Sequence, residues 1–514
     1  MRQEGVMHRH IPSGWIREEL GNLAEKITKG ATPTTYGYEF QRSGINFIKI
    51  QNVFAGAIDL ASITDFISED AHQNQKKSIL KVDDVLFSIA GTIGETSIVK
   101  QQHLPANTNQ AFAIISGFSE LLLPKYLEFQ LRSFVSQKTK EKARGGAMNN
   151  VSLDDLKHLE LLLPPLNEQH RIVAKIEELF SELDKGIEVL KTAREQLKVY
   201  RQALLKHAFE GKLTAAWRDA NPDKLEPAAV LLARIQTERE QRYQQQLQQW
   251  QTTGGSKPKA PKPLPPLTTE ELAELPELPE GWGWVRLMDV SDQITDGTHH
   301  TPTYVPNGVP FISVKDIRDG VVSFSECKYI SEEEHAELCS RCKPEADDLL
   351  ITKSGTIGRL ALVPEIDFSL FVSVALVKTQ TMRQLVLPKW FLYAFEYHLM
   401  SLNIDQDIKG GLLKNYHLED LRLAHIPLAS TEEQQALIMA LEERITEIAQ
   451  LDLTLTASLQ QSEALRQSIL KRAFSGQLVT QDPHDEPAAV LLARIRAEKD
   501  AQSAQPRKSG KGKA

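Results

Sequence analysis

The sequence repeats itself once, and this repeat restricts the folds that the chain can adopt. The repeated segments keep the same order, and the two copies lie about 260–267 positions apart. Three pairs show the repeat best: Pro12–Trp15 (PSGW) and Pro279–Trp282 (PEGW), Gly91–Gly94 and Gly355–Gly358 (both GTIG), and Glu226–Ile235 and Glu486–Ile495 (both EPAAVLLARI). Because self-similarity at one fixed period is the signature of a repeated structural unit, we predict a tandem duplication of a two-part unit.

The first part of each unit has the pattern of a mixed α/β domain. Short β-rich runs such as Ile45–Ile50 and Val85–Ile89 are separated by Gly, Pro and Asn, as expected for short strands joined by turns. The same texture returns after Pro279. We therefore expect a first globular domain over residues 1–163 and a second one over residues 276–425.

The second part of each unit is a long helical segment with apolar residues seven positions apart, the spacing of a coiled-coil seam. The predicted seam residues are Ile176, Leu183, Leu190, Leu197 and Leu204 in the first copy, and Leu441, Ile448, Leu455 and Ile469 in the second. Parts of a second stripe are Ile172, Leu179 and Tyr200, and Leu437, Leu451 and Leu465. We expect the two helices to pack as an antiparallel intramolecular coiled coil, with burial in a globular core as the alternative.

The predicted fold class is thus α+β, with two tandem mixed α/β domains separated by two long helices in a pseudo-twofold arrangement. The helical regions are expected over residues 164–250 and 426–500. Residues 251–275 form a Pro-rich linker, for which a plain spacer is favoured over a ligand of an SH3-type domain. Residues 501–514 form a basic tail.

Composition excludes several classes of protein. An apolar fraction of 41% with 25% charged residues is globular. Three cysteines in 514 residues cannot make a disulfide scaffold and favour a reducing compartment. No apolar run is long enough for a membrane span, and the first residues lack the apolar region of a signal peptide. A cytoplasmic protein is expected.

Catalytic motifs are absent from the sequence. It contains no GxxxxGK[ST] phosphate loop, no GxGxxG after a strand, no HExxH, and no Asn-Pro-Pro-aromatic tetrapeptide of an amino-methyltransferase. Glu345–Lys353 superficially resembles a nuclease metal site, but it lacks an acid two residues before Lys353, and its twin Val82–Ala90 has no lysine. We interpret both segments as a turn that leads into a strand, and we predict no catalytic residue.

A cluster of Cys327, His335, Cys339 and Cys342 is the one metal-like pattern, because C-x-x-C spacing can bind zinc. The equivalent positions of the first half hold no cysteine, and Cys342 falls opposite Ser78. Reduced, packed thiols are therefore favoured over zinc, and no metal is predicted.

The order of the repeated motifs resembles the DNA-specificity subunits of type I restriction–modification systems, over about residues 12 to 500. The resemblance rests on four motifs, each present twice: the two Pro-x-Gly-Trp segments; Asp84–Gly94 and Asp348–Gly358, which end in GTIG; Leu163–Val173 (LPPLNEQHRIV) and Ile426–Ile438 (IPLASTEEQQALI); and Arg201–Leu213 and Arg466–Leu478. Each motif alone is weak, whereas their order, found twice, is specific.

The resemblance implies a non-catalytic protein whose partner is double-stranded DNA. Each globular domain would be a target-recognition domain that reads one half of a bipartite, asymmetric sequence. The helices would set the spacer between the halves and dock two methyltransferase subunits, which restriction/translocase subunits join. No cofactor is expected in this chain, since S-adenosylmethionine, ATP and Mg would belong to the partner subunits.

Candidate DNA contacts are polar and basic residues of the duplicated Gly-rich turns and of one basic stretch, because phosphate and base contacts need such side chains. The candidates are Lys29, Thr32, Ser88, Thr92, Lys138, Lys140, Lys142, Arg144, Lys353, Ser354, Thr356 and Lys409. For any single one, a solvated residue or a structural turn is the alternative interpretation.

Charge is divided unequally between the halves. Residues 1–265 hold 35 Lys+Arg against 31 Asp+Glu, while residues 266–514 hold 25 against 37. The second half would therefore need the basic surface of partner subunits to hold DNA. A bivalent coiled-coil scaffold that binds two proteins without DNA is the competing function, and a zinc enzyme built on the cysteine cluster is a weaker one.

Overall fold

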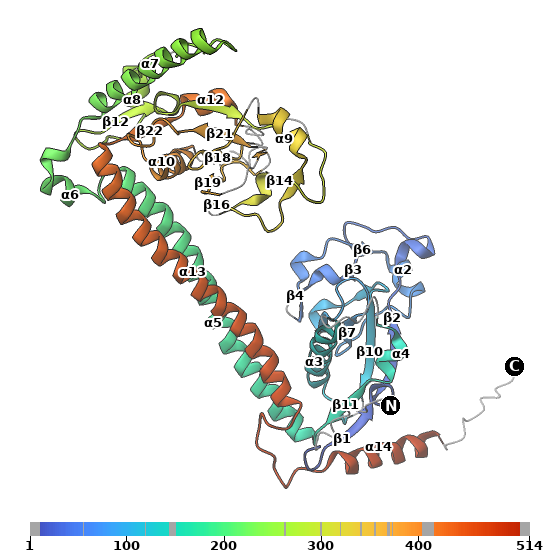
Figure 1. The fold of residues 1–514 in the computed structure, drawn as a ribbon. Helices are drawn as coiled ribbons and strands as arrows, with labels where there is room; N and C mark the ends of the chain where they lie inside the picture. Colours follow the sequence, from blue (N-terminus) through green and yellow to red (C-terminus); the bar gives the residue numbers. More distant parts are fainter. Residues whose placement is uncertain are drawn as a thin grey trace, which may run out of the picture. The chain divides into compact units, whose positions relative to one another are not determined.

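The computed structural model divides into two compact units. Unit 1 comprises Met1–Lys191 with Thr456–Ala514, and unit 2 comprises Thr192–Leu455. The structure describes residues 11–54, 56–118, 120–142, 151–261, 264–298, 301–318, 320–339, 342–353, 356–366, 371–372, 374–402 and 416–503, without the side chains of residues 135–142, 371 and 498–503. Figure 1 labels the elements.

The domain of unit 1 is built on a four-stranded antiparallel sheet in the order β2-β10-β7-β8. These strands are Ala24–Lys29 (β2), Phe112–Phe118 (β10), Val85–Ser88 (β7) and Thr96–Ile98 (β8). A second sheet has the order β6-β3-β9, and β4 pairs with β5, and β1 with β11. The remaining elements are β1 (Ile16–Glu19), α1 (Leu20–Leu23), β3 (Ile45–Ile48), β4 (Val53–Phe54), β5 (Ala57–Ile58), β6 (Phe66–Ile67), α2 (Glu69–Asn74), β9 (Ala106–Thr108), α3 (Pro124–Lys142), α4 (Leu153–Lys157) and β11 (Glu160–Leu163).

The domain of unit 2 repeats this topology. Its sheets have the orders β13-β21-β18-β19 and β17-β14-β20, and β15 pairs with β16, and β12 with β22. The elements are α8 (Thr269–Ala273), β12 (Gly283–Arg286), β13 (Gln293–Asp296), β14 (Val309–Ile312), β15 (Ile317–Arg318), β16 (Val321–Val322), β17 (Lys328–Ile330), α9 (Glu332–Cys339), β18 (Leu349–Ile351), β19 (Leu360–Leu362), β20 (Phe371–Val372), β21 (Ala375–Lys378), α10 (Pro388–Ser401), α12 (Leu418–Leu423) and β22 (His425–Leu428). The same strand order in both units is the structural form of the sequence duplication.

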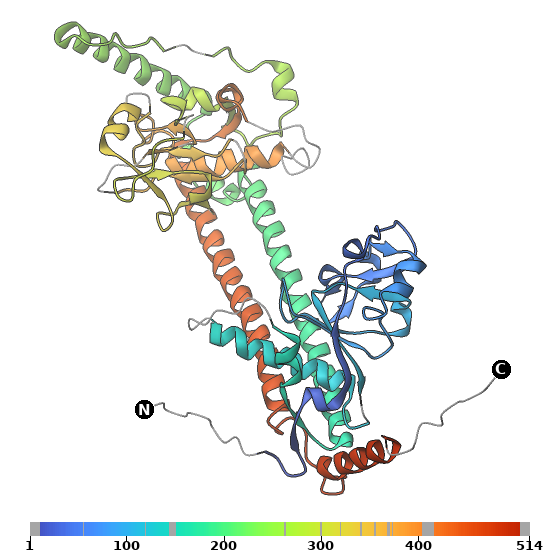
Figure 2. The ribbon, with the colours of Figure 1, turned by 90° about the vertical axis from the view of Figure 1, so that its right-hand side faces the viewer.

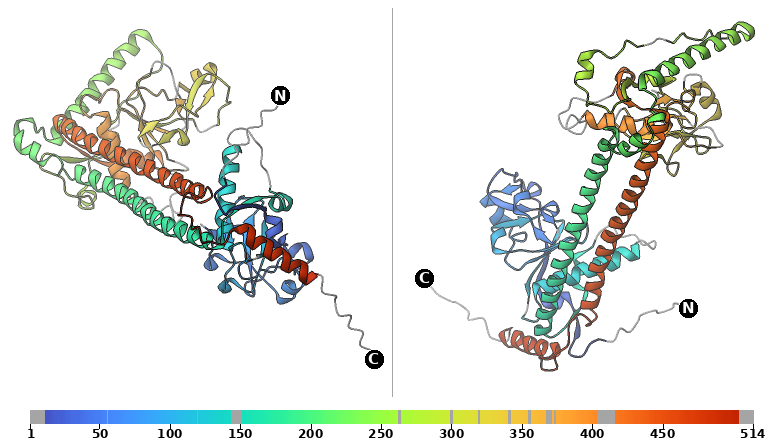
Figure 3. Two further views of the ribbon diagram at one scale, coloured as in Figure 1. Left: turned by 90° about the horizontal axis from the view of Figure 1, so that it is seen from below. Right: turned by 90° about the vertical axis from the view of Figure 1, so that its left-hand side faces the viewer.

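Two long helices, α5 (Leu166–Phe209) and α13 (Thr431–Ala473), each contribute to both units. In unit 1, Arg466 of α13 pairs with Asp184 of α5, and Asp485, beyond α13, pairs with Arg171 at 2.6 Å. In unit 2, Arg194 Nε lies 2.8 Å from Asp452 Oδ1. Within unit 1, the earlier residue of α5, Arg171, pairs with the later residue, Asp485, and the later residue of α5, Asp184, pairs with the earlier one, Arg466. The two chain segments therefore run antiparallel there (Figures 2 and 3).

None of the predicted seam residues is exposed. Ile176, Leu204, Leu441, Ile448 and Ile469 are buried, and Leu183, Leu190, Leu197 and Leu455 are half-buried. The second stripe is wrong in part, because Tyr200, Leu451 and Leu465 are 52%, 54% and 50% exposed. Ile172 and Leu437 of this stripe are buried, so only its later members lack a neighbour that covers them.

The start of the second helical region differs from the prediction of residue 426. Ile426–Leu428 still belong to β22, which pairs with β12, and α13 begins at Thr431. The first helical region consists of α5, α6 (Ala215–Ala220) and α7 (Ala228–Thr253). Within the described ranges, no helix combines the length and apolar character that crossing a bilayer requires.

The repeated decamer opens one helix in each unit. Ala228, at the start of α7, donates its backbone N–H to Gly281 O at 2.8 Å in unit 2. Ala488, at the start of α14 (Ala488–Ser503), donates to Gly14 O at 3.0 Å in unit 1. Each unit therefore contains the same set of parts, although unit 1 takes them from both ends of the described chain.

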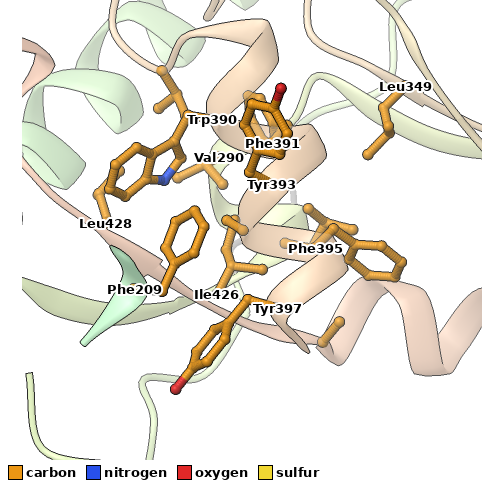
Figure 4. Close-up of a cluster of buried hydrophobic side chains, with 14 of the residues drawn as sticks. Phe209, Val290, Leu349, Trp390, Phe391, Tyr393, Phe395, Tyr397, Ile426 and Leu428 are labelled. Carbon is orange, nitrogen blue, oxygen red and sulfur yellow. The ribbon is translucent and has the colours of Figure 1, made fainter. Parts of the chain in front are cut away.

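Aromatic side chains join α5 to the domain of unit 2. Phe209, near the end of α5, packs against Trp390 and Tyr397 of α10, with ring centroids 5.1 and 5.5 Å apart (Figure 4). In unit 1, Phe474, the residue after α13, packs on Tyr126 of α3 with ring centroids 5.5 Å apart. The hydrophobic core of each domain thus continues into the long helices.

Candidate nucleic-acid interface

The repeated tryptophans are joints between domain and helix. Trp15 Nε1 donates to Glu168 Oε2 at 3.0 Å in unit 1, and Trp282 Nε1 donates to Glu433 Oε2 at 2.8 Å in unit 2. Glu168 and Glu433 are both buried in the first turns of the long helices. The indole N–H groups of the Pro-x-Gly-Trp motifs therefore have a structural role, because each is already hydrogen-bonded to a glutamate of the protein.

The glutamines that follow these glutamates complete the joints. Gln169 accepts a hydrogen bond from Leu123 N at 3.0 Å and donates to Leu121 O at 2.7 Å. Gln434 accepts from Leu387 N at 2.9 Å and donates to Leu385 O at 3.2 Å. Since a buried amide without partners is costly, these bonds fix the segment before α3 or α10 to the long helix.

The acidic segments that resemble a nuclease site are turns, as predicted. Asp83 and Asp347 have φ values of 67° and 71°, the left-handed conformation that ends a tight turn. The buried carboxylate of Asp84 accepts from Lys81 N at 2.8 Å, and that of Asp348 accepts from Glu345 N at 2.9 Å. Burial raises the pKa of Asp348 to about 6. Both aspartates hold the turn that starts a central strand.

Several predicted DNA contacts of unit 1 meet at one end of its four-stranded sheet. Lys29 ends β2 opposite Ala113, and Ser88 ends β7 opposite Phe112, so both lie beside the start of β10. Thr32 donates to Gln110 Oε1 in the turn before β10. Val151, the first described residue after 142, donates to Ile89 O at 3.2 Å. We call this region the sheet end of unit 1.

A glycine is required at the centre of this region. A Cβ at Gly30 would lie 2.2 Å from the backbone oxygens of Thr108 and Asn109, which is far inside contact distance. Gly30 also donates to Phe112 O at 3.2 Å. The glycine of the Thr-Lys-Gly segment is therefore explained by close backbone packing, and only the neighbouring side chains remain available for a ligand.

Ser88 has no exposed surface for a DNA contact. Its buried hydroxyl donates to Thr92 O at 2.5 Å and accepts from Glu95 N at 2.8 Å. Thr352 makes the same two bonds in unit 2, to Thr356 O at 2.6 Å and from Arg359 N at 2.8 Å. These hydroxyls shape the GTIG turns, whereas Thr92 and Thr356 are exposed on them.

The sheet end of unit 2 lies around Asp296 of β13 and Lys353, which follows β18. Lys353 Nζ lies 2.9 Å from Asp296 Oδ2, and their side chains are 22% and 10% exposed. Tyr416 donates its backbone N–H to Lys353 O at 2.8 Å. The charge of Lys353 is thus balanced within the protein, whereas Lys29, whose twin position is Asp296, is exposed.

Other predicted contacts cannot be placed. Arg144, Ser354 and Lys409 lie outside the described residues, and the side chains of Lys138, Lys140 and Lys142, in α3, are not described. The predicted interface is therefore defined by Lys29, Thr32 and Thr92 in unit 1, and by Lys353 and Thr356 in unit 2.

The cysteine cluster does not form a ligand set. Cys327 and Cys342 are buried in the apolar core of unit 2, and burial raises the pKa of the Cys342 thiol to about 11. Cys339 Sγ lies 3.1 Å from His335 Nε2. The described residues contain no group of three or more potential metal ligands. A buried thiol with a raised pKa is a poor thiolate ligand, so the packing favours a structural role.

Sequence reasoning missed a pair of hairpins beside the sheet ends. Phe54, on the hairpin β4–β5, is 80% exposed, and Arg318, at the equivalent place on β15–β16, is also exposed. A Cβ at Gly91 would lie 3.6 Å from Ile50 Cδ1, which places the segment before β4 against the GTIG turn. The repeat gives no signal for Phe54 or Arg318, because the two halves differ there.

Comparisons with known proteins agree with this architecture. Residues 12–197 and 279–458 match the family described as type I restriction modification DNA specificity domain. The chain is 32% identical over 241 residues to the type I restriction enzyme EcoBI specificity subunit of Escherichia coli, covering 45% of this chain and 49% of that protein. It is 29% identical over 215 residues to the EcoKI specificity subunit of Escherichia coli strain K12, covering 38% and 44%.

The chain spans about half the length of the curated relatives it matches. One solved structure, from work on complex assembly and conformational transition of the type I R-M system, has a TM-score of 0.61 at 20% identity and covers 91% of this chain and 99% of its own. At this sequence identity, the similarity to the solved structure concerns the fold alone.

Proposed function

Since the chain belongs to the type I restriction–modification DNA-specificity family, we propose that it is the non-catalytic subunit that selects the DNA sequence on which such a complex acts. Each domain reads one half of a bipartite target. The observation that carries this proposal is the pair of units with the same strand order and different side chains at the sheet ends. Two related but unequal readers suit an asymmetric sequence.

The long helices would set the spacer between the two half-sites. A helix of 44 residues such as α5 is about 66 Å long at 1.5 Å per residue. Half-sites one helical turn apart in the major groove are separated by about 34–36 Å. The helix is therefore long enough to fix such a separation, and a change in its length would change the unread spacer.

The outer faces of the helices would dock two methyltransferase subunits. Val189 of α5 in unit 1 is 68% exposed, and in unit 2 Met439 and Leu453 of α13 are both 64% exposed. Apolar surface of this kind supports a protein contact. Restriction/translocase subunits would join this core, and S-adenosylmethionine, ATP and Mg would be bound by the partner subunits.

Genome-wide mapping of methylated adenines tests the proposal. A host that carries the methyltransferase genes is compared with and without the gene for this chain. We expect a bipartite motif with a fixed gap that disappears when the gene is deleted. Methylation that is unchanged on deletion would reject the proposal and favour a scaffold that binds proteins only.

A gel-shift titration tests whether DNA binding depends on the partners. Because residues 266–514 carry 25 basic against 37 acidic residues, the isolated chain should bind DNA weakly, and added methyltransferase subunits should tighten binding. Equal affinity with and without the methyltransferase subunits would contradict the proposal that these subunits contribute to DNA binding.

A further inference from the structure

Each domain carries a two-stranded hairpin that projects an exposed side chain beside its sheet end. In unit 1 the hairpin β4–β5 pairs Val53 with Ile58 and Phe54 with Ala57. Phe54 is 80% exposed, the largest value among the exposed large apolar side chains of the described residues. The outer pair of the hairpin, Phe54 and Ala57, is exposed.

The described residues on both strands of this hairpin are tied to the domain of unit 1. Val53 and Ile58 are each 6% exposed and belong to the domain core. Buried Asn52, just before β4, accepts from Lys49 N at 2.8 Å and donates to Ser62 O at 2.8 Å. Behind the turn, Ser97 Oγ donates to Gly56 O at 3.2 Å. Phe54 is therefore exposed on a strand whose neighbouring residues are buried and hydrogen-bonded.

The hairpin of unit 2 has the same backbone pairing with different outer residues. The inner pair Ile317 and Val322 is buried, and the outer pair is Arg318 and Val321, both exposed. Asp316 replaces Asn52 and accepts from Ser313 N at 2.9 Å, which preserves the support before the strand. The framework is thus shared, while the outward side chain changes from Phe54 to Arg318.

We propose that these hairpins enter the major groove, and that Phe54 and Arg318 each read one base pair of their half-site. This inference rests on the proposed function. The major groove admits a two-stranded β-ribbon. There, an aromatic side chain can contact the C5-methyl group of thymine, whereas arginine can donate two hydrogen bonds to O6 and N7 of guanine. Phe54 reads a thymine, and Arg318 reads a guanine in the other half-site.

Base analogues test each contact on the complex of this chain with its methyltransferase subunits. The target is first selected from a randomised DNA duplex library. Deoxyuridine then replaces each thymine of one half-site in turn, which removes the methyl group and leaves base pairing intact. We expect one replacement to weaken binding by about fourfold, the effect of one buried methyl group, and Phe54→Ala to abolish this sensitivity.

For the other half-site, 7-deazaguanine replaces each guanine and removes the N7 acceptor. One replacement should weaken wild-type binding by about tenfold, and Arg318→Ala should be insensitive to it. Leu60→Ala is the matched control, because Leu60 is exposed on the segment after β5 but lies off the hairpin. This control should keep both sensitivities.

The outcomes separate the inference from the function on which it rests. If the wild-type complex selects no bipartite sequence, the proposed function fails. If it selects one but Phe54→Ala and Arg318→Ala respond to the analogues as the wild type does, the hairpin inference alone is wrong. Both variants change exposed side chains, so an unchanged thermal midpoint will verify that they fold.

Discussion

The two units use the same joint between domain and helix but carry different charges where the sheet ends. Trp15 and Trp282 bond to glutamates at the start of the long helices in the same way. In contrast, Lys29 of unit 1 is exposed, while its counterpart Asp296 is bound by Lys353. Residues that hold each unit together are thus the same in both domains, whereas residues at the sheet ends differ between them.

The largest effect is expected in the contact between the long helices. Leu441 in unit 2 and its counterpart Ile176 in unit 1 are both 0% exposed. Leu441→Asp or Ile176→Asp would bury a charge and should lower the free energy of unfolding by about 4 kcal/mol. Urea unfolding measures the loss. Leu451→Asp is the control, because Leu451 is 54% exposed and should change stability little.

Leu190→Asp addresses the function of the same contact. Leu190 is half-buried, so its loss of stability should be smaller, but a charge there should uncouple the half-sites. Methylation that keeps its target and spacer length in this variant would argue against the helices as the spacer.

The joints should differ in strength despite their common plan. Glu433 bonds to Trp282, to Thr214 Oγ1 at 2.7 Å and to Arg218 Nη1 at 2.6 Å. Because Glu433→Ala leaves the 15% exposed Arg218 side chain without this partner, we expect a loss of about 3 kcal/mol in urea unfolding.

Glu168→Ala is the matched change in unit 1. Burial raises the pKa of Glu168, with the bond from Trp15 acting against it, so part of the cost of burying this carboxylate disappears with the side chain. We expect a loss of about 1 kcal/mol. Equal losses at Glu168 and Glu433 would mean that Arg218 adds nothing to the joint of unit 2.

A pH-dependent difference should come from α10 and α3. His398 of α10 stands where unit 1 has Phe134, and burial lowers the pKa of His398 to about 4. Between pH 6.5 and about 4, this histidine is protonated in the unfolded chain but stays neutral in the folded chain. The stability that the folded chain has above pH 6.5 is therefore lost as the pH falls toward 4. His398→Phe should remove a loss of about 3 kcal/mol.

Unfolding curves of wild type and His398→Phe between pH 7 and about pH 4 measure this term. Asp348, with its pKa raised to about 6, changes stability in the opposite direction, but it does so in both proteins. The difference between the two curves therefore reports His398 together with its effect on the neighbouring His425. Parallel curves would contradict a buried, neutral histidine.

The smallest effect concerns the sheet ends. If Lys29 contacts a phosphate, Lys29→Ala should reduce the slope of log affinity against log salt by about 0.9. Lys353→Ala should leave this slope unchanged, because Asp296 already balances its charge. Fluorescence anisotropy of the full complex at several salt concentrations compares them. The same slope change for both would show that the ion pair opens on DNA.

The duplication and the two long helices could be predicted because they depend on spacing that the chain shows twice. The stripe through Leu451 and Leu465 failed because the spacing shows where apolar residues recur and not which of them a neighbour covers, and these two side chains are exposed. At the candidate site, the repeat pointed to Ser88, whose hydroxyl shapes its own turn. Residues that read different bases must differ between the two halves, so a search for repeated residues does not find them. Phe54 was missed for this reason.

The discontinuity of unit 1 has a consequence for folding during synthesis. Unit 2 is a continuous stretch, Thr192–Leu455, so all of its parts leave the ribosome before the last part of unit 1 is made. The domain of unit 1 emerges first, yet its contact between Gly14 and Ala488 spans almost the whole described chain. Although domains generally fold from the N-terminus onward, the unit that begins first here is completed last.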